Sequence, residues 1–285
     1  MRMQKNTYRT YTHISSKHKL FDLKLDEVWQ YRELVILFTR RNFKVVYKQT
    51  IIGPLWLFIN PLLTSLMHMI VFGNIAKLGT DGVPQFLFYI AGNAIWVFFQ
   101  QCVEKNASTF TSNAGLFGKV YFPRLTIPIS NVCSTAIRFF IQMILVIGLI
   151  IYYCIRQIMI VHIERWFLLP FVLLWLGVMG MGCGLIMSSL TTKYRDLSVL
   201  VGFGMNLWMY GTPVVYPISA LSDNLKNIIL LNPVTMPIEV FRYIFLGAGV
   251  VDIGYLGFSI GFTVMVFLIG IILFNRVERT FMDTV

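Results

Sequence analysis

Residues 253–275 read IGYLGFSIGFTVMVFLIGIILFN and contain no charged side chain. A helix needs roughly 20 consecutive apolar residues to cross the hydrocarbon core of a bilayer, and this stretch exceeds that length. Five further stretches of the same kind lie upstream, at 51–76, 82–103, 125–155, 166–192 and 197–222. We therefore predict an all-α polytopic membrane protein with six transmembrane helices.

The composition agrees with a membrane protein. Of 285 residues, 56% are hydrophobic, 15% are aromatic and 13% are charged, whereas about 25% are charged in soluble domains. We predict a cytoplasmic tail at 1–33 and one transmembrane domain at 34–285. Residues 1–20 are polar and basic, without the apolar core of a cleaved secretory signal.

The net charge of +11 is distributed unevenly between the two sides of the predicted spans. Segments on the side of the N-terminus carry 18 Lys and Arg residues, the opposite segments carry 5, and Arg138 lies inside a span. Without the six cations far from any span, the split is still 12 against 5. Because positive charge concentrates on the cytoplasmic side, we predict that both termini are cytoplasmic. The basic charge is thus explained by topology, and no nucleic acid partner is predicted.

Residues 28–50 form a pattern with two unlike faces, which predicts an amphipathic helix in the cytoplasmic headgroup region. The apolar face carries Tyr31, Leu34, Phe38 and Val45, and the basic face carries Arg40, Lys44 and Lys48. A helix packed on a soluble partner is the alternative. Gly53 and Pro54 then begin the first span, which Pro61 is expected to interrupt.

Two connecting segments are too long for simple turns. In the first, residues 117–124 (FGKVYFPR) combine aromatic side chains, expected to be exposed, with two cations. That character is typical of a loop that docks on a soluble partner, although ordinary cytoplasmic basic enrichment would also produce it. The second segment holds two short apolar pieces, 227–238 and 243–251, broken by Pro233 and Pro237. Their lengths predict re-entrant or interfacial helices between spans five and six.

Polar residues in the spans exclude several mechanisms. All thirteen acidic residues lie at or beyond a span end, which argues against the intramembrane carboxylates of ion-driven carriers. His68 and Arg138 are the intramembrane ionisable residues. The chain has no GxxxxGK[ST] phosphate-binding loop, so an energy source must lie in another chain. The four cysteines show no metal-ligand spacing, and no metal site is predicted.

Several motifs together resemble one known family. They are YKQTIIGPLWLFINPL at 47–62, KVYFPR at 119–124, YRD at 194–196, WMYGTPVVYP at 208–217, LNP at 231–233 and EVFR at 239–242. In this order they resemble the type 2 ABC transporter permeases of bacterial surface polysaccharide export. The resemblance is to the O-antigen export permease family Wzm, whose relatives export capsule or teichoic acid.

The resemblance implies a homodimer of six-span subunits around a channel in the bacterial inner membrane. Two copies of a cytosolic ATPase would lie beneath it and bind ATP and Mg, so this chain would be no enzyme and would hold no cofactor. The amphipathic helix would be the interface and gate helix. The loop at 104–124 would contain the ATPase coupling contacts, for which the candidates are Lys119, Tyr121, Phe122 and Arg124.

The substrate implied by the resemblance is a lipid-linked polysaccharide. Aromatic rings stack on sugars, and the channel candidates near span ends and breaks are Trp56, Phe58, Trp96, Phe99, Trp208, Tyr210 and Tyr216. An interfacial aromatic belt is the alternative for each ring. The headgroup of the substrate lipid would be attracted by the cations Arg40, Lys44 and Lys48. The alternative is that these cations only bind anionic membrane lipids and fix the topology.

Two other function classes remain open beside a polysaccharide exporter. An ATP-independent channel would suit the aromatic spans and re-entrant segments. A membrane enzyme acting on lipid-linked sugar is disfavoured because the spans offer no carboxylate pair and no nucleophile with a base. The glycines at 177, 180, 182 and 184 predict that the fourth span is a closely packed helix.

Overall fold

The computed structural model describes residues 25–47, 53–117, 119–120, 122–160, 162–194 and 196–284, with side chains described from residue 26 to 45 and up to residue 277 at the two ends. Every regular element in these ranges is helical. The main helices are α1 (Leu25–Gln30), α2 (Arg32–Tyr47), α3 (Trp56–His68), α4 (Gln85–Ala107), α5 (Thr109–Phe117), α6 (Thr126–Ile155), α7 (Leu169–Thr191), α8 (Leu197–Tyr210), α9 (Asp223–Leu230), α10 (Thr235–Leu246) and α11 (Ile253–Thr284). Short helical segments are η1 (Gly53–Leu55), η2 (Met69–Ile75), η3 (Ile163–Leu168) and η4 (Ile218–Ala220).

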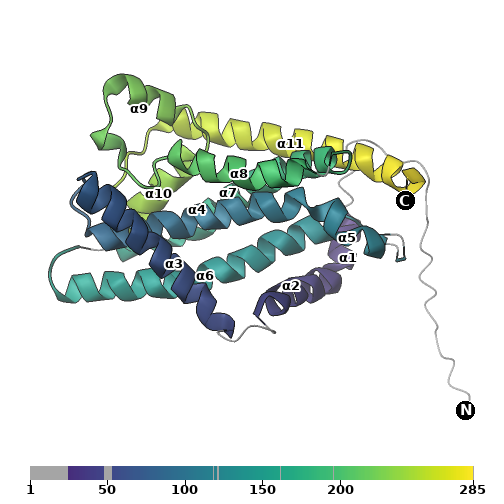
Figure 1. Cartoon of the computed structure of the whole chain (residues 1–285), viewed down its shortest axis with the longest axis horizontal. Coiled ribbons are helices and arrows are strands. Elements are labelled where there is room, and N and C mark those ends of the chain that lie inside the picture. The colour runs from purple at the N-terminus through teal and green to yellow at the C-terminus, as the bar shows by residue number, and fades with distance from the viewer. Residues whose placement is uncertain are drawn as a thin grey trace, which may run out of the picture.

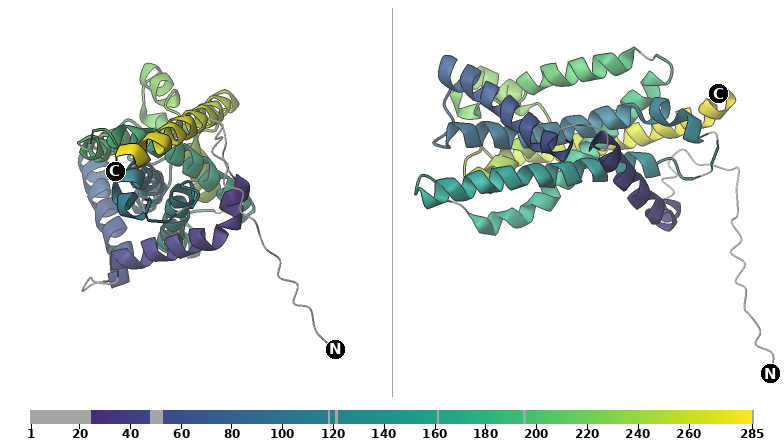
Figure 2. Two further views of the ribbon diagram at one scale, coloured as in Figure 1. Left: turned by 90° about the vertical axis from the view of Figure 1, so that its right-hand side faces the viewer. Right: turned by 60° about the horizontal axis from the view of Figure 1, so that its bottom comes forward.

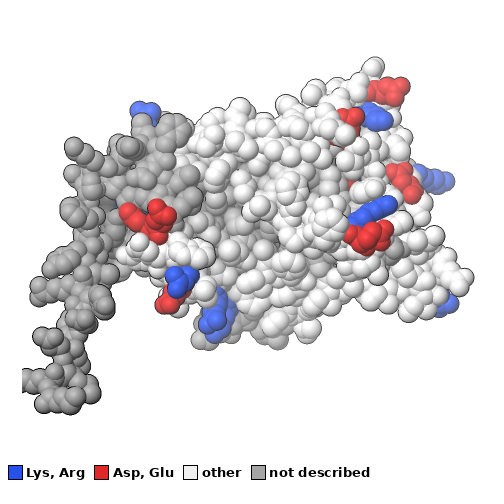
Figure 3. All heavy atoms as spheres, turned by 180° about the vertical axis from the view of Figure 1, so that it is seen from behind, with Lys and Arg blue, Asp and Glu red and all other residues white. Residues whose placement is uncertain are grey.

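The multi-span prediction is confirmed. Among the described residues, five helical stretches are long and apolar enough to cross a membrane: Gly53–Ile75, Gln85–Ala107, Thr126–Ile155, Ile163–Thr191 and Ile253–Val277. On the face seen in Figure 3, charged side chains gather toward the two ends of the bundle and leave an uncharged middle. This distribution suits a bilayer around the middle of the bundle.

The predicted fifth span is shorter as a helix than expected. α8 has 14 residues and a length of about 21 Å, and it packs on α4 and α7; Figure 1 shows that it runs along the bundle. Pro213 explains its end, because a proline ring clashes with the carbonyl of the residue four positions before it, here Met209. Residues 211–217 therefore continue as turns and extended chain.

α9 and α10 form the predicted helix pair before the last span, bent by 100°. Their bounds differ from the predicted 227–238 and 243–251. Asn232 and Pro233 lie in the turn between the helices, while Pro237 lies in the first turn of α10, where a missing N–H costs nothing. Gly247 ends α10 with a φ of +67°, a conformation that glycine adopts without steric cost.

The expectation that Pro61 interrupts the first span is wrong. α3 continues through Pro61 to His68, and the irregularity comes later, where η2 is a π-helix. Pro61 lies in the second turn of α3, so it deprives only the carbonyl of Leu57 of a helical partner.

α4 lies at the centre of the bundle and packs on α7 through glycines. A Cβ added at Gly180 would lie 2.7 Å from the Cβ of Cys102, and one at Gly184 would lie 2.5 Å from the Cβ of Asn106. Both distances are too short for any residue but glycine. The predicted close packing of the fourth span is confirmed, and its physical basis is the direct approach of two backbones.

Aromatic rings join the elements at the end of the bundle near the C-terminus. Phe110 stacks on Phe274 at 4.5 Å between ring centroids, and Phe122 lies 5.7 Å from both Phe117 and Phe38. Phe117 and Phe122 were expected to be exposed, but they are buried. The expectation failed because α2, α5 and α11 meet there and supply an apolar environment that the loop sequence does not reveal.

The amphipathic helix predicted at 28–50 is divided into α1 and α2, with a turn at Tyr31, and residues 48–50 fall outside the described ranges. Viewed along the bundle, α2 runs crosswise along one side of it (Figure 2) and packs on α6. Phe38 is buried on one side, and Arg40 and Lys44 are exposed on the other. Val45, predicted on the apolar face, is 70% exposed.

Substituting Gly184→Ala should destabilise the bundle by about 1–3 kcal/mol, because the new methyl group overlaps α4. The measurement is the thermal unfolding midpoint of the purified protein in detergent. Gly148→Ala is the matched control, since no atom lies within 4 Å of the added Cβ. Equal midpoints for the two variants would contradict this packing.

Candidate functional site

A cavity of about 780 Å³ lies between α3, α4, α6 and α8. Its lining combines aromatic rings with polar side chains and few charges. The lining residues are Trp56, Leu57, Asn60, Pro61, Thr64, His68, Asn93, Trp96, Val97, Gln100, Gln101, Glu104, Arg138, Gln142, Asn206, Met209 and Tyr210. Such a polar cavity inside a membrane-spanning bundle is the candidate functional site.

The helical repeat explains how α3 and α4 line this cavity. On α3 the lining includes Asn60, Thr64 and His68, each four residues after the last and therefore on one helix face. On α4, the residues from Asn93 to Glu104 recur at intervals of three or four. That run of α4 is about 16 Å long. Two polar helix faces therefore line the same elongated space.

Hydrogen bonds orient the polar face of α4. The indole Nε1 of Trp96 donates to Oε1 of Gln100 at 3.1 Å, and Nε2 of Gln100 donates to Oε1 of Glu104 at 2.8 Å. The same Nε2 lies 3.4 Å from Oδ1 of Asn206 on α8. Successive turns of α4 thus hold one another in place, and α8 is joined to them.

Two basic side chains complete the cavity wall. Arg138 on α6 donates from Nη1 to Oε1 of Gln101 at 3.3 Å and from Nη2 to the carbonyl of Asn42 at 3.4 Å. His68 is buried, and its Nδ1 has no hydrogen-bond partner among the described residues. The imidazole therefore contributes to the cavity wall while one of its ring nitrogens stays buried.

Three asparagines form a chain of hydrogen bonds that connects α2, α6 and α4. Nδ2 of Asn42 donates to Oδ1 of Asn131 at 3.0 Å, and Nδ2 of Asn131 donates to Oδ1 of Asn106 at 3.1 Å. Nη2 of Arg41 also lies 3.5 Å from Oδ1 of Asn113 in α5. The crosswise helix α2 is therefore linked both to the cavity helices and to α5.

The aromatic channel candidates occupy different environments. Trp56, Trp96 and Tyr210 line the cavity. Phe99 is fully buried behind it, with its ring 5.6 Å from both Trp96 and Trp208. The Nε1 of Trp208 donates to Oδ1 of Asn232, and the hydroxyl of Tyr216 donates to the carbonyl of Tyr210. Phe58 is half-buried and does not belong to the lining.

Sequence reasoning missed the carboxamides, because it considered only ionisable residues inside the spans. The amides in the lining are Asn60, Asn93, Gln100, Gln101, Gln142 and Asn206. The sequence did contain a signal for them, because these amides interrupt apolar stretches and those of α4 recur at helical spacing. Glu104 was placed beyond a span end, but α4 continues to Ala107 and its carboxylate reaches the cavity.

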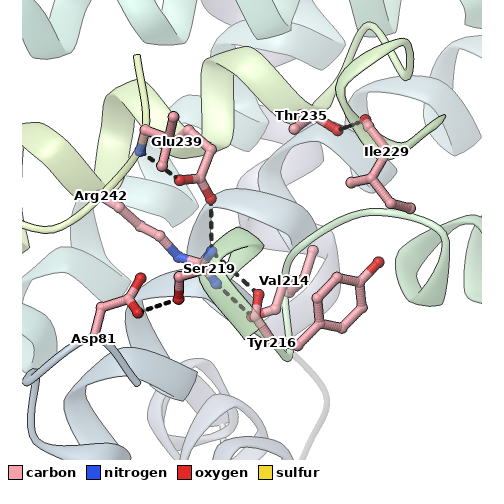
Figure 4. Close-up of polar contacts among 9 residues, drawn as sticks. Asp81, Val214, Tyr216, Ser219, Ile229, Thr235, Glu239 and Arg242 are labelled. Carbon is pink, nitrogen blue, oxygen red and sulfur yellow. Dashed lines mark hydrogen bonds and ion pairs between the residues drawn. The ribbon is translucent and has the colours of Figure 1, made fainter. Parts of the chain in front are cut away.

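At the end of the bundle away from α2, a buried ion pair within α10 is hydrogen-bonded to the loop after α8 (Figure 4). Oε1 of Glu239 lies 2.8 Å from Nη1 of Arg242, and its Oε2 accepts the backbone N–H of Val250. Nη2 of Arg242 donates to the carbonyl of Val214 at 2.9 Å. The guanidinium also lies over the ring of Phe88 at 4.1 Å. From the sequence, Glu239 and Arg242 were expected in a connecting segment outside the spans, but both side chains are buried in the folded protein.

The predicted ATPase contacts are only partly accessible. Lys119 is exposed, whereas Phe122 is buried and Arg124 is 8% exposed. The guanidinium of Arg124 lies 5.2 Å from the ring of Phe117. Two further candidate site residues, Tyr121 of the loop and Lys48 of the basic face, fall outside the described residues.

Comparison with known proteins identifies the family. The family described as ABC-2 type transporter matches residues 33–246, well over half of the chain. The chain belongs to the ABC-2 type transporter family. The predicted resemblance to ABC transporter permeases is thereby confirmed.

Curated relatives cover most of this ABC-2 permease. Two proteins of Klebsiella pneumoniae, each named O-antigen export system permease protein RfbA, are 26% identical over 252 and 253 residues. Each alignment covers 88% of this chain and 94% of the relative. A protein of the same name from Myxococcus xanthus is 29% identical over 221 residues, covering 77% and 82%.

Removing one partner of the buried pair should destabilise the permease strongly. We expect Glu239→Gln to cost about 3–5 kcal/mol, because it leaves the charge of Arg242 buried without its carboxylate. The measurement is again the thermal unfolding midpoint in detergent. Glu164→Gln is the matched control, since Glu164 contacts His162 at the exposed surface and such pairs contribute little. A Glu239 variant as stable as this control would contradict the proposed importance of the pair.

Proposed function

We propose that this chain is the membrane-spanning permease of an ATP-driven exporter that moves a lipid-linked polysaccharide out of the cytoplasm. The observation that carries the proposal is the cavity, in which tryptophans and carboxamides line one space between helices of an apolar bundle. The names of the curated relatives support an O-antigen-like glycan as the substrate. Export of capsule or teichoic acid is the alternative within the family.

The physical reason is the hydration of sugars. A polysaccharide cannot cross hydrocarbon bare, because each unpaired hydroxyl costs several kcal/mol. Carboxamides replace water well, since each offers both donors and acceptors. Indole rings such as those of Trp56 and Trp96 add flat apolar surfaces for the faces of the sugar rings.

We further propose that two copies of the chain form the complete channel. The cavity is flanked by α3 and α8, which also expose large apolar side chains, among them Leu63 and Met67 on α3 and Phe203 and Leu207 on α8. Some of this surface would face lipid. The remainder would pack against the second copy, so that two cavities join into one conduit.

The proposed energy source is a cytosolic ATPase, two copies of which bind ATP and Mg beneath the dimer. The end of the bundle with α2, α5 and the C-terminus is the proposed cytoplasmic end, in the inner membrane, as the distribution of basic residues suggests. Within the loop, Lys119 and Val120 are the exposed described residues, and these are the proposed contacts. Phe122 and Arg124 would instead hold the loop in shape.

Replacing Lys119→Glu together with Val120→Asp should weaken ATPase binding roughly tenfold or more, because both changes place negative charge in the contact. Copurification and transport-coupled ATP hydrolysis are the measurements. Lys77→Glu, an equally exposed reversal at the other end of the bundle, is the control. Unchanged coupling in the double variant would remove the docking role from this loop.

The basic face of α2 is the proposed lipid-headgroup site. Arg40 and Lys44 are exposed on a helix that runs crosswise along one side of the bundle, where a pyrophosphate headgroup would meet them from the cytoplasmic leaflet. Each cation near an anionic surface contributes about 1 kcal/mol. Lys48, the third cation of the predicted site, stays a prediction.

Reversing the charge of Arg40 and Lys44 to glutamate should reduce export and leave completed glycan inside the cell, because headgroup attraction is replaced by repulsion. Surface and intracellular polysaccharide are measured in the same cells, and ATPase copurification checks assembly. The Arg40→Lys, Lys44→Arg variant keeps the charge and serves as the control. If the charge-reversed variant exported a normal amount of surface glycan, Arg40 and Lys44 would not be a headgroup site, and their role would be limited to fixing the topology.

A further inference from the structure

We propose that the cavity selects uncharged glycans and discriminates against polymers that carry a phosphodiester or carboxylate in each repeat. This inference rests on the proposed export function and narrows its substrate class. It separates a neutral O-antigen-like chain from teichoic acids and acidic capsules, which the family relationship leaves as alternatives.

The first support is the balance of charge in the described lining. Among its side chains are one carboxylate, Glu104, and one guanidinium, Arg138. The other polar groups are mostly carboxamides, which form hydrogen bonds with hydroxyls without preferring an anion. A run of about 16 Å on α4 would hold a few residues of an extended polymer, so an anionic polymer would bring its charge to a wall of no net charge.

The second support is the arrangement of these two charges. The guanidinium of Arg138 already donates to Gln101 and to the backbone carbonyl of Asn42. The carboxylate of Glu104 accepts from Gln100, and it would repel any anion that passed along α4. Such repulsion is much stronger in a protein interior than in water. An anionic repeat would therefore meet one guanidinium and one carboxylate, with no excess of positive charge in the lining to replace its hydration.

The other nearby cations, apart from Arg138, lie outside the described lining. Lys105 follows Glu104 on α4, but its Nζ lies 3.0 Å from the hydroxyl of Thr135 on α6 and is not part of the lining. Arg40 and Lys44 are exposed on α2, which runs crosswise along one side of the bundle. Several positive charges are thus available for one terminal lipid phosphate group, whereas along the proposed path of the polymer the charge of Arg138 is balanced by that of Glu104.

The third support is His68, which lines the cavity and is 8% exposed. A neutral imidazole offers one hydrogen-bond donor and one acceptor, as suits hydroxyl groups, and adds no fixed charge to the lining. In a symmetric dimer the lining would be duplicated, so that carboxylates and guanidiniums would remain equal in number.

The experiment measures oligosaccharide binding to the purified full chain in lipid nanodiscs through quenching of tryptophan fluorescence. The probes are a neutral mannose oligosaccharide, an oligogalacturonate and a glycerol phosphate oligomer of matched length, at physiological salt. We expect the neutral probe to bind about tenfold or more tightly than either anion, because the lining offers a buried anion no excess of positive charge.

A charge-changed variant links this preference to the cavity. Gln142→Lys adds a positive charge to the lining and should reduce the preference for the neutral probe, whereas Gln157→Lys adds the same charge at an exposed site and should not. Should Gln142→Lys fail to insert, Glu104→Gln makes an equivalent change in charge. Insensitivity of the preference to both cavity variants would overturn the inference.

The remaining outcomes separate the inference from the proposed function. Equal binding of neutral and anionic probes would overturn the selection of uncharged glycans and leave polysaccharide export intact. Failure of all three probes to bind, with the protein folded and inserted, would overturn the cavity as a glycan site and with it the proposed function.

Discussion

A polar group inside a membrane-spanning bundle must find a partner within the protein, and the placement of α4 satisfies this requirement. One face of α4 meets α7 so closely that Gly180 and Gly184 allow backbone contact. The opposite face carries a hydrogen-bonded run from Trp96 through Gln100 to Glu104. If α4 were rotated, these polar groups would face α7 or lipid without partners, so close packing on one side maintains the cavity on the other.

The two ends of the cavity helices are held by different chemistry. At the end near α9, the buried pair of Glu239 and Arg242 attaches α10 to the backbone at Val214. At the end near α2, neutral amides such as Asn131 connect the helices. Breaking a buried ion pair is far costlier than exchanging one amide hydrogen bond for another. The α10 end is therefore suited to rigidity, and the α2 end to rearrangement by a partner.

The described lining carries no net charge, and this matters for a site that lies next to anionic lipids. A conduit of cations would attract anionic polymers and anionic lipid headgroups alike, whereas carboxamides and indoles interact with sugars without a net field. Arg138, held by Gln101 and the carbonyl of Asn42, connects this neutral wall to the basic helix α2. The proposed headgroup site and the proposed sugar site are thus separated in space.

Hydropathy in the sequence was sufficient to predict a multi-span helical protein, the crosswise amphipathic helix, a bent helix pair before the last span and a glycine-packed fourth span. Each of these depends on local composition, which is readable along the chain. The burial of Phe122, the ion pair of Glu239 with Arg242 and the cavity amides could not be predicted in this way. They depend on how helices distant in sequence are rotated toward one another, and a polar residue in an apolar stretch is costly or useful according to what it then faces.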